Sequence, residues 1–538
     1  MSHQKKSAYF PLVFLVVIVS VFIQAIQPQD KKKKQRIDID NADLIVHDES
    51  IIANADRLLG NVSFRRDGAL MFCDSAYSYT DSKKFDTFGN VHIIQGDTLH
   101  LYGDKMFYDG DIKLAKFVGK VKLVDKSITL TTEALDFDLN TNIGYYNNGG
   151  KIVDTANVLT STIGRYYSNE DLLYFKESVV LTKKDFVLRA DTLKYNSKTE
   201  RAFIVGPTTI TGTGKDGVLY SENGWYDTKQ NVAELYKASK ITNKSQVLEA
   251  DTLFYNRATG NGSGKHSVTL TDTTNKVVIK GKIGVYNENT KMAFVTDSAM
   301  FIQYGKKDTM YMHADTLQTK PDTSDVNRKD DKYFMAYRKV RFHKPDLQGQ
   351  CDSLGYRMKD STMLMFYDPT LWSDKNQMTA EKIQYTAKNP DPGIARLDNN
   401  AFIVMVEDSV KFNQISGKTI IGQIFENKLR IADVNGNAQT LYYLKDKNKY
   451  SGMNRMVSSK IRLHLTENKI DSIRFYPKPE GKVIPIKELK AEDIQLDGFR
   501  WRESEKPVDQ YDLYPIDEKR KKNAGSSKIP ALIKKLVL

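Results

Sequence analysis

The sequence predicts an all-β protein: an elongated, β-solenoid-like array of repeats about 30 residues long. Three observations predict this fold class. A short phrase recurs along the chain, apolar residues alternate with polar ones, and turn signals separate the alternating stretches. Between about residue 40 and residue 480 no stretch has the periodicity of an amphipathic helix.

The recurring phrase is clearest at residues 190–196 (ADTLKYN) and 250–256 (ADTLFYN), with looser copies at 314–317 and 351–356. Its acidic position can be followed through Asp74, Asp104, Glu133, Asp191, Glu222, Asp251, Asp315, Asp352 and Glu381. One such unit is too small to bury its apolar face alone. A fixed period therefore indicates one supersecondary unit that gains a core by stacking on its neighbours.

A second marker, Gly-x-Val-x-apolar, starts about fifteen residues before the phrase, at Gly60, Gly89 and Gly119. Period-two alternation, as in Leu193-Lys194-Tyr195, is typical of half-buried strands. We therefore expect each repeat to open with the glycine marker and to contain two or three short strands.

The composition along the chain predicts six segments. These are a signal peptide or membrane anchor (1–25), a basic linker (26–41), the best-matched repeats (42–260), further degenerate repeats (261–440) with a polar loop at 319–332, a region that caps the array or docks a partner (441–517), and a charged tail expected to be disordered (518–538).

The first segment has the order of a secretory signal. Lys5 and Lys6 precede an apolar run at 10–23, and Ala25 offers a cleavage site. The run is short for a spanning helix, which needs ~20 apolar residues, yet residues 8–26 are just long enough to span as an uncleaved anchor. Cleavage and anchoring both remain open, and both predict export to the periplasm, with or without membrane association.

The formal net charge of +13 predicts attraction to polyanions. Because the chain lacks a nucleic-acid-binding signature, we expect no nucleic acid partner. An anionic glycolipid or polysaccharide fits the exported compartment, and a merely solvating role for the lysines remains the alternative. Cys73 and Cys351 stand where other copies of the phrase have alanine, which predicts two free, buried thiols.

No catalytic signature is present in the sequence. The eight histidines occur singly rather than at metal-ligand spacing, and the chain has no nucleophile elbow, phosphate-binding loop or dinucleotide fingerprint. The repeated acid occurs once per repeat, whereas a glycosidase needs a converging pair. We predict a structural role for this acid, and a protein with no catalytic residue, metal site or cofactor.

The repeat pattern resembles the OstA/LptA lipopolysaccharide-transport superfamily. Residues 188–195 (LRADTLKY) and 248–255 (LEADTLFY) carry the resemblance, together with the glycine marker and the export signal. It is clearest over 42–260 and weaker to about residue 435. The resemblance implies a twisted, open β-jellyroll whose strands cross two facing sheets and whose apolar interior accepts the acyl chains of lipopolysaccharide.

The resemblance also implies partners: lipopolysaccharide through its lipid A, an inner-membrane ATP-driven lipopolysaccharide exporter, an outer-membrane assembly protein, and further copies joined end to end. The chain would then be a non-enzymatic periplasmic bridge that helps to move this lipid from the inner to the outer membrane. The alternative is an exported structural or adhesive β-solenoid that binds polysaccharide or protein. A carrier predicts an accessible apolar interior, whereas an adhesin predicts a closed core with aromatic residues outside.

Alternation in the best-matched repeats predicts which side chains line the lipid-binding interior. They are Leu99, Leu101, Val121, Leu123, Leu130, Phe137, Leu188, Leu193, Leu248 and Leu253. Because strand side chains alternate between two faces, a bulge that shifts the register would turn any of them outward.

Overall fold

The computed structural model describes residues 38–514, apart from 67, 156, 214–216, 323–331, 389–391, 427, 448 and 467–468. The predicted signal peptide or anchor and the charged tail lie outside the described residues, as do most of the basic linker and of the 319–332 loop. The described chain forms two compact units. Residues 38–126 and 136–140 make the first, and residues 127–135 and 141–514 make the second.

The first unit contains antiparallel strands β1 to β7. Their bounds are β1 (Asp38–Asn41), β2 (Leu44–His47), β3 (Ala55–Arg66), β4 (Ala69–Tyr79), β5 (Lys84–Gln95), β6 (Leu99–Asp109) and β7 (Leu114–Asp125). The next strand, β8 (Ile128–Asp138), contributes residues to both units.

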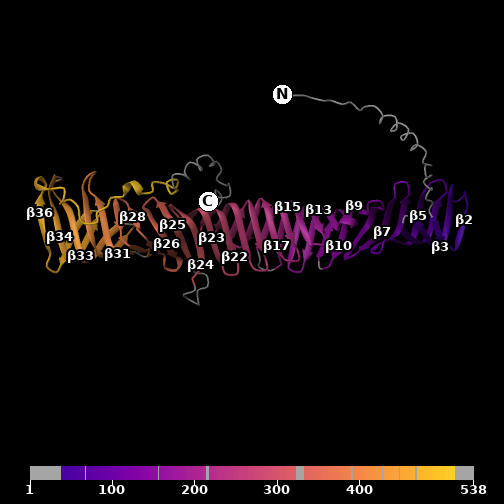
Figure 1. Ribbon diagram of the computed structural model, residues 1–538, viewed down its shortest axis with the longest axis horizontal. Helices are drawn as coiled ribbons and strands as arrows, with labels where there is room; N and C mark the ends of the chain where they lie inside the picture. Colours follow the sequence, from indigo (N-terminus) through magenta and orange to yellow (C-terminus); the bar gives the residue numbers. More distant parts are fainter. Residues whose placement is uncertain are drawn as a thin grey trace, which may run out of the picture. The chain divides into compact units, whose positions relative to one another are not determined.

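The second unit is also almost entirely antiparallel strand (Figure 1). Its long strands mostly pair with the next strand along the chain, and in places two short strands pair with the two halves of the long strand before them. Their bounds are β9 (Ile143–Tyr146), β10 (Gly150–Asp154), β11 (Asn157–Ser161), β12 (Ile163–Tyr167), β13 (Leu172–Lys183), β14 (Phe186–Asn196), β15 (Arg201–Gly212), β16 (Val218–Asp227), β17 (Val232–Lys237), β18 (Ser239–Asn243), β19 (Gln246–Ala250), β20 (Thr252–Asn256), β21 (Asn261–Asp272), β22 (Val277–Asn287), β23 (Met292–Tyr304), β24 (Thr309–Pro321), β25 (Lys332–Lys344), β26 (Leu347–Arg357), β27 (Thr362–Phe366), β28 (Thr370–Ser373), β29 (Asn376–Thr379), β30 (Lys382–Thr386), β31 (Gly393–Val406), β32 (Phe412–Phe425), β33 (Lys428–Asp446), β34 (Lys449–Thr466), β35 (Lys469–Tyr476) and β36 (Glu480–Pro485).

Helix is limited to four single 3₁₀ turns, η1 (Ser168–Glu170), η2 (Met358–Asp360), η3 (Ile486–Glu488) and η4 (Glu503–Glu505), within the described chain. In this same part of the chain, no helix is long and apolar enough to cross a membrane.

Each long strand is bent in its middle by a β-bulge. In β13 the pairing register shifts between Lys176 and Val179, and the two intervening residues, Glu177 and Ser178, have positive φ of 64° and 53°. The bend divides the strand between two layers: layer 1 contains residues 172–176, paired with 192–196 of β14, and layer 2 contains 179–183, paired with 186–190. We call the bent edge the corner, and the opposite edge, where the turns lie, the mouth.

The two layers face each other through their buried side chains. In the second unit, Phe186 of layer 2 meets Tyr226 of layer 1 edge to face with ring centroids 4.9 Å apart, and the tilted rings of Phe301 and Phe334 also make a cross-layer contact, at 4.6 Å. In the first unit, Phe64 packs on Phe85 at 4.8 Å. Because apolar residues alternate in both halves of each strand, both layers bury one face. The predicted all-β, jellyroll-like fold class is confirmed.

The glycine marker lies in the middle of a strand, at the corner, and not where a repeat opens. Gly89 and Asn90 of β5 have φ of 74° and 45°. A Cβ on Gly89 would lie 2.2 Å from Oδ2 of Asp74, the acid of the recurring phrase, and Asn90 Nδ2 donates to that same oxygen at 2.9 Å. The repeated acid therefore has the structural role that the sequence predicted: it accepts a hydrogen bond from a side-chain amide at the corner.

In the second unit the corners use other residues for the same task. Asn399 and Asn400 both have positive φ, and their side-chain amides donate to Glu381 at 3.0 and 2.9 Å. At another corner, Lys237 forms an ion pair with Glu222 at 2.7 Å. The two markers of the sequence thus recur with one period because they meet in space.

After β36 the chain turns back over the outer face of layer 2 (Figure 1). We call residues 486–514 the strap. Near β36, Leu496 packs in a cluster with Phe402 and Leu441, and at its far end Leu513 and Tyr514 pack on outward-facing side chains of β22 and β23. The strap therefore covers apolar surface that belongs to strands far from it in the chain.

Two buried glutamines fix the strap to layer 2. Gln414 Nε2 donates to the Ile494 carbonyl and its Oε1 accepts from the Leu496 N–H, both at 2.8 Å. Gln377 makes the same pair of bonds to the Arg500 carbonyl, at 2.6 Å, and to the N–H of Arg502, at 2.8 Å. Each glutamine side chain thus presents the donor and acceptor that a neighbouring strand would present.

Candidate functional site

The apolar interior between the two layers is the candidate site. All ten side chains predicted to line it point inward, with relative exposures of 6% or less: Leu99, Leu101, Val121, Leu123, Leu130, Phe137, Leu188, Leu193, Leu248 and Leu253. The bulges lie at the corners, between half-strands, so they did not turn these residues outward. Whether the ten residues contact lipid stays a prediction.

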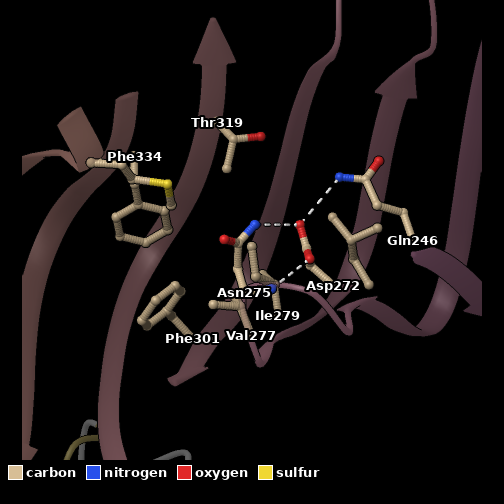
Figure 2. Close-up of a pocket in the computed structure, with 10 residues that line it drawn as sticks. Gln246, Asp272, Asn275, Val277, Ile279, Phe301, Thr319 and Phe334 are labelled. Carbon is tan, nitrogen blue, oxygen red and sulfur yellow. Dashed lines mark hydrogen bonds between the residues drawn. The ribbon is translucent and has the colours of Figure 1, made fainter. Parts of the chain in front are cut away.

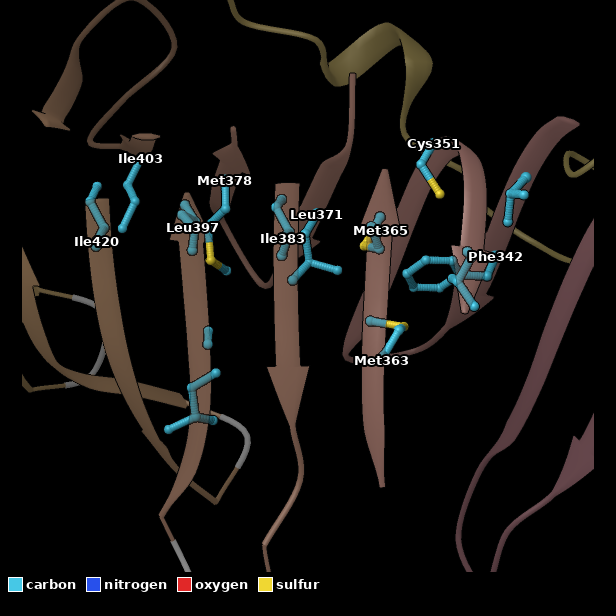
Figure 3. Close-up of a cluster of buried hydrophobic side chains, with 14 of the residues drawn as sticks. Phe342, Cys351, Met363, Met365, Leu371, Met378, Ile383, Leu397, Ile403 and Ile420 are labelled. Carbon is cyan, nitrogen blue, oxygen red and sulfur yellow. The ribbon is translucent and has the colours of Figure 1, made fainter. Parts of the chain in front are cut away.

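The interior of the second unit continues through the degenerate repeats as a sulfur-rich stretch. Figure 3 shows Phe342, Cys351, Met363, Met365 and Met378 among the buried side chains of successive strands, and each is at most 7% exposed. Methionine is unbranched and adapts to irregular space. Apart from Cys351, which the looser copy of the phrase at 351–356 marked, these side chains were missed because the repeats here are too degenerate to show which residues point inward.

The two cysteines are free and buried, as the sequence predicted. The pKa of each thiol is raised to about 12, mainly by burial, with the neighbouring Asp74 contributing to the shift of Cys73. Because the thiolate is the reactive form, both residues behave as small apolar side chains at neutral pH.

Polar side chains bridge the mouth of the second unit. Tyr195, at the layer 1 end of β14, donates its hydroxyl hydrogen to Asp154 Oδ2 at 2.8 Å and accepts from Asn157 Nδ2 at 2.9 Å. Asp154 and Asn157 flank the β10–β11 turn, which belongs to layer 2. All three are at most 1% exposed, and burial, reinforced by Asp154, raises the pKa of Tyr195 far above its usual value.

Three more hydrogen bonds cross the mouth farther along. They run from Lys183 Nζ to the Thr228 carbonyl at 2.5 Å, from Arg257 Nη2 to the Asp185 carbonyl at 2.7 Å, and from Asn243 Nδ2 to Glu288 Oε1 at 2.5 Å. Together with the two bonds of Tyr195 we call them the latch row. In each bond, one residue lies at the end of layer 1 and the other at the end of layer 2.

A notch in the mouth lies beside the last of these bonds. It is a cavity of about 40 Å³, lined by Gln246, Asp272 and Asn275 on one side and by mostly apolar side chains, among them Phe301 and Phe334, on the other (Figure 2). Asn275 Nδ2 donates to Asp272 Oδ2 at 3.0 Å, which keeps these polar groups on one side. Apolar side chains of the interior are therefore reached from outside here, through an opening too small for a whole acyl chain.

A larger cavity of about 910 Å³ lies between the strap and the corners of β31 to β33. Its lining combines apolar side chains such as Phe402 with charged ones, among them Glu381, Lys418, Asp497 and Arg500. Such a lining does not suit an alkyl chain.

The outer face of the first unit carries aromatic residues. Across β4, β5 and β6, Phe72, His92 and Tyr102 pair in register, and the rings of His92 and Tyr102 stack with centroids 4.3 Å apart. His92 Nε2 lies 3.1 Å from His100 Nδ1. The histidines that appeared isolated in sequence are thus neighbours across the β5–β6 hairpin, and their spacing of eight positions around one turn is the signal that could have found them.

The histidine pair is not accompanied by further metal ligands. In the described ranges, three or more His, Cys, Asp or Glu residues nowhere come together as a metal site. Burial lowers the pKa of His92, and the neighbouring His100 lowers it further.

Comparison with known proteins gives the family. A family model described as OstA-like protein matches residues 34–191 and 213–311. A search of curated proteins found no match. The matched residues include the phrase at Ala190 and Asp191, the three glycine corners of the first unit and every residue of the latch row except Tyr195. The chain belongs to the OstA/LptA-like superfamily.

Proposed function

We propose that this chain is a non-enzymatic periplasmic bridge that binds the acyl chains of lipopolysaccharide between its two layers and helps to move the lipid from the inner to the outer membrane. The observation that carries the proposal is the inward, apolar face that successive repeats of each unit build, in a chain of this superfamily. Burying one methylene is worth ~0.8 kcal/mol, so ten methylenes supply roughly 8 kcal/mol without any chemistry.

The partners follow from the same proposal. Binding of this kind is passive, so direction must come from an ATP-driven exporter in the inner membrane, and delivery needs an assembly protein in the outer membrane. End-to-end joining between copies is supported by the terminal strands, since Leu44 and Ile45 of β2 are each 53% exposed and Val483 of β36 is 58% exposed. Exposed strand edges pair readily with another chain.

A second candidate, an exported structural or adhesive β-solenoid, is favoured by a specific observation. The interior is closely packed, and the outer face carries Phe72, Tyr102 and Phe107, each between 36% and 39% exposed. A closed core with aromatic residues outside is what an adhesive surface predicts. Deciding between the candidates requires a measurement of which face meets the lipid in cells.

Photo-crosslinking makes that decision. A photoreactive leucine analogue at Leu253, which is fully buried, is compared with a photoreactive residue at its neighbour Phe254, which is 40% exposed on the outer face. The carrier predicts lipopolysaccharide adducts from position 253, and from Leu193 as a second inner position, but not from 254. Adducts that are confined to 254, or that contain only protein or polysaccharide, refute the carrier and support the adhesive candidate.

A further inference from the structure

We propose that the latch row is a lateral gate, which must part before the acyl chains of an anionic amphiphile can pass through the mouth into the interior. This inference rests on the carrier function proposed above. It also explains how a packed interior is compatible with carrying lipid, because the conformation with closed latches is then the lipid-free conformation of the carrier.

The latch bonds are separate from the bonds that hold the strands together. They join residues 38 to 72 positions apart, from Asn157 and Tyr195 at one extreme to Asp185 and Arg257 at the other. Strand pairing within each layer continues behind them in unbroken ladders on both sides of the corner. The latches can therefore open while every strand keeps its neighbours.

Behind the latch row lie the side chains that an acyl chain would meet. Leu188 and Leu248 come from layer 2, and Leu193 and Leu253 from layer 1, and all four are buried. At the opposite edge the layers are joined only through the corners, where the chain crosses by one bulge per strand. Parting of the mouth therefore corresponds to a small rotation of the layers about the row of corners.

Two of the latches suit an anionic head group, whereas Asp154 and Glu288 place carboxylates at others. Lys183 Nζ and Arg257 Nη2 are cationic donors, yet their latch acceptors are the neutral main-chain carbonyls of Thr228 and Asp185. Hydrogen bonds from a cation to a phosphate oxygen are stronger than those to a carbonyl. A phosphorylated head group would thus compete for these two donors and release their latches while its chains enter behind it.

The notch sets where entry begins. The last latch joins Asn243 to Glu288, and the notch opens directly beside it, with Gln246 three positions from Asn243. Phe301 and Phe334 already face this opening (Figure 2). A chain tip that enters here widens the mouth next to the Asn243–Glu288 latch first, and the remaining latches follow in order.

The test is a reversible crosslink across the mouth. Asn243→Cys and Glu288→Cys are introduced together into a chain that carries Cys73→Ala and Cys351→Ala, alanine being the residue of the other repeats, and are joined by a short bifunctional reagent that reduction cleaves. The matched control is Lys240→Cys with Glu249→Cys. These residues pair on neighbouring strands of the same layer, with Lys240 Nζ 3.6 Å from Glu249 Oε1, and a link between them does not cross the mouth. Binding of purified lipid A is measured before linking, after linking and after reduction.

The gate predicts that the cross-mouth link weakens lipid A binding at least tenfold, that reduction restores it in the same sample, and that the control link has no effect. A monoacylglycerol of matched chain length, which lacks the anionic head, should bind more weakly than lipid A to the unlinked protein, and phosphatidylglycerol shows whether any anionic lipid suffices. Unchanged lipid A binding by the cross-linked form overturns the gate and leaves the carrier standing. If lipid A binds to none of the forms, the carrier itself is refuted.

Discussion

Replacing Gly89 with alanine tests the account of the corner. The residue has φ of +74°, and a Cβ there would lie 2.2 Å from Oδ2 and 2.9 Å from Cγ of Asp74. The left-handed backbone alone costs about 1–2 kcal/mol for a residue with a Cβ. Displacing the carboxylate from Asn90 adds roughly 1–3 kcal/mol of overpacking. We therefore expect a local destabilisation of about 2–5 kcal/mol.

Gly68→Ala is the matched control, because Gly68 has φ of +82° but no atom within 4 Å of its Cβ position. It should lose only the backbone part, about 1–2 kcal/mol. The assay is native-state hydrogen exchange of the amides flanking each glycine, since stacked repeats need not unfold in one step. Asp74→Ala combined with Gly89→Ala should cost less than the sum of the two single changes. Additive losses, or a Gly89→Ala loss no larger than that of Gly68→Ala, would refute the reasoning.

Three further outcomes follow from the structure. Gln377→Ala removes two hydrogen bonds to the strap, so the free energy of local opening of the strap should fall by about 1–3 kcal/mol. Faster proteolysis within residues 486–514 would measure this change, and an unchanged cleavage rate would contradict the role of Gln377 in fixing the strap. Cys73 and Cys351, with pKa about 12, should react with maleimide at pH 7.5 far more slowly in the folded protein than in urea, and equal rates would show that the thiols are accessible. Burial and His100 hold the pKa of His92 in the folded protein below 6.5, so as the pH falls the imidazole is protonated first in the unfolded chain. The stability that is present above pH 6.5 should therefore be lost as the pH drops through the lowered pKa of His92. Hydrogen exchange in the β5–β6 hairpin from pH 7.5 to 5 measures this loss, and His92→Phe should make the stability of the hairpin less dependent on pH.

The inner face could be predicted because strand side chains alternate with a strict period of two. Leu188 and Leu193 lie on opposite sides of a bulge, and their parity differs, yet both point inward because the corner resets the register between them. The glycine marker was harder to place from sequence. A glycine with positive φ serves a strand start and a mid-strand bend equally well, and only the position of Asp74 against Gly89 distinguishes them.

The latch row and the contacts of the strap could not be predicted, and the histidine pair left only its spacing around one turn as a signal, for a common physical reason. Each depends on which residues the fold brings together across the mouth, over the outer face or across a hairpin, and none repeats with the period of the array. Lys183 and Thr228 lie 45 positions apart and belong to no shared motif. In the sequence, Gln377 and Gln414 cannot be distinguished from other polar strand residues. Their role depends on the strap, whose main-chain groups form hydrogen bonds with both side chains.

The strap changes how the second unit responds to force and heat. In a simple stack each repeat touches only its neighbours, so the end repeats fray first and unfolding spreads inward. Here a single segment is bound to β32 through Gln414, to β29 through Gln377 and to β25 through Arg341, whose guanidinium donates to the Asp512 carbonyl at 2.7 Å. Because strands that would otherwise fray one by one are bound to the same segment, the terminal repeats of this unit are protected from fraying and unfold cooperatively.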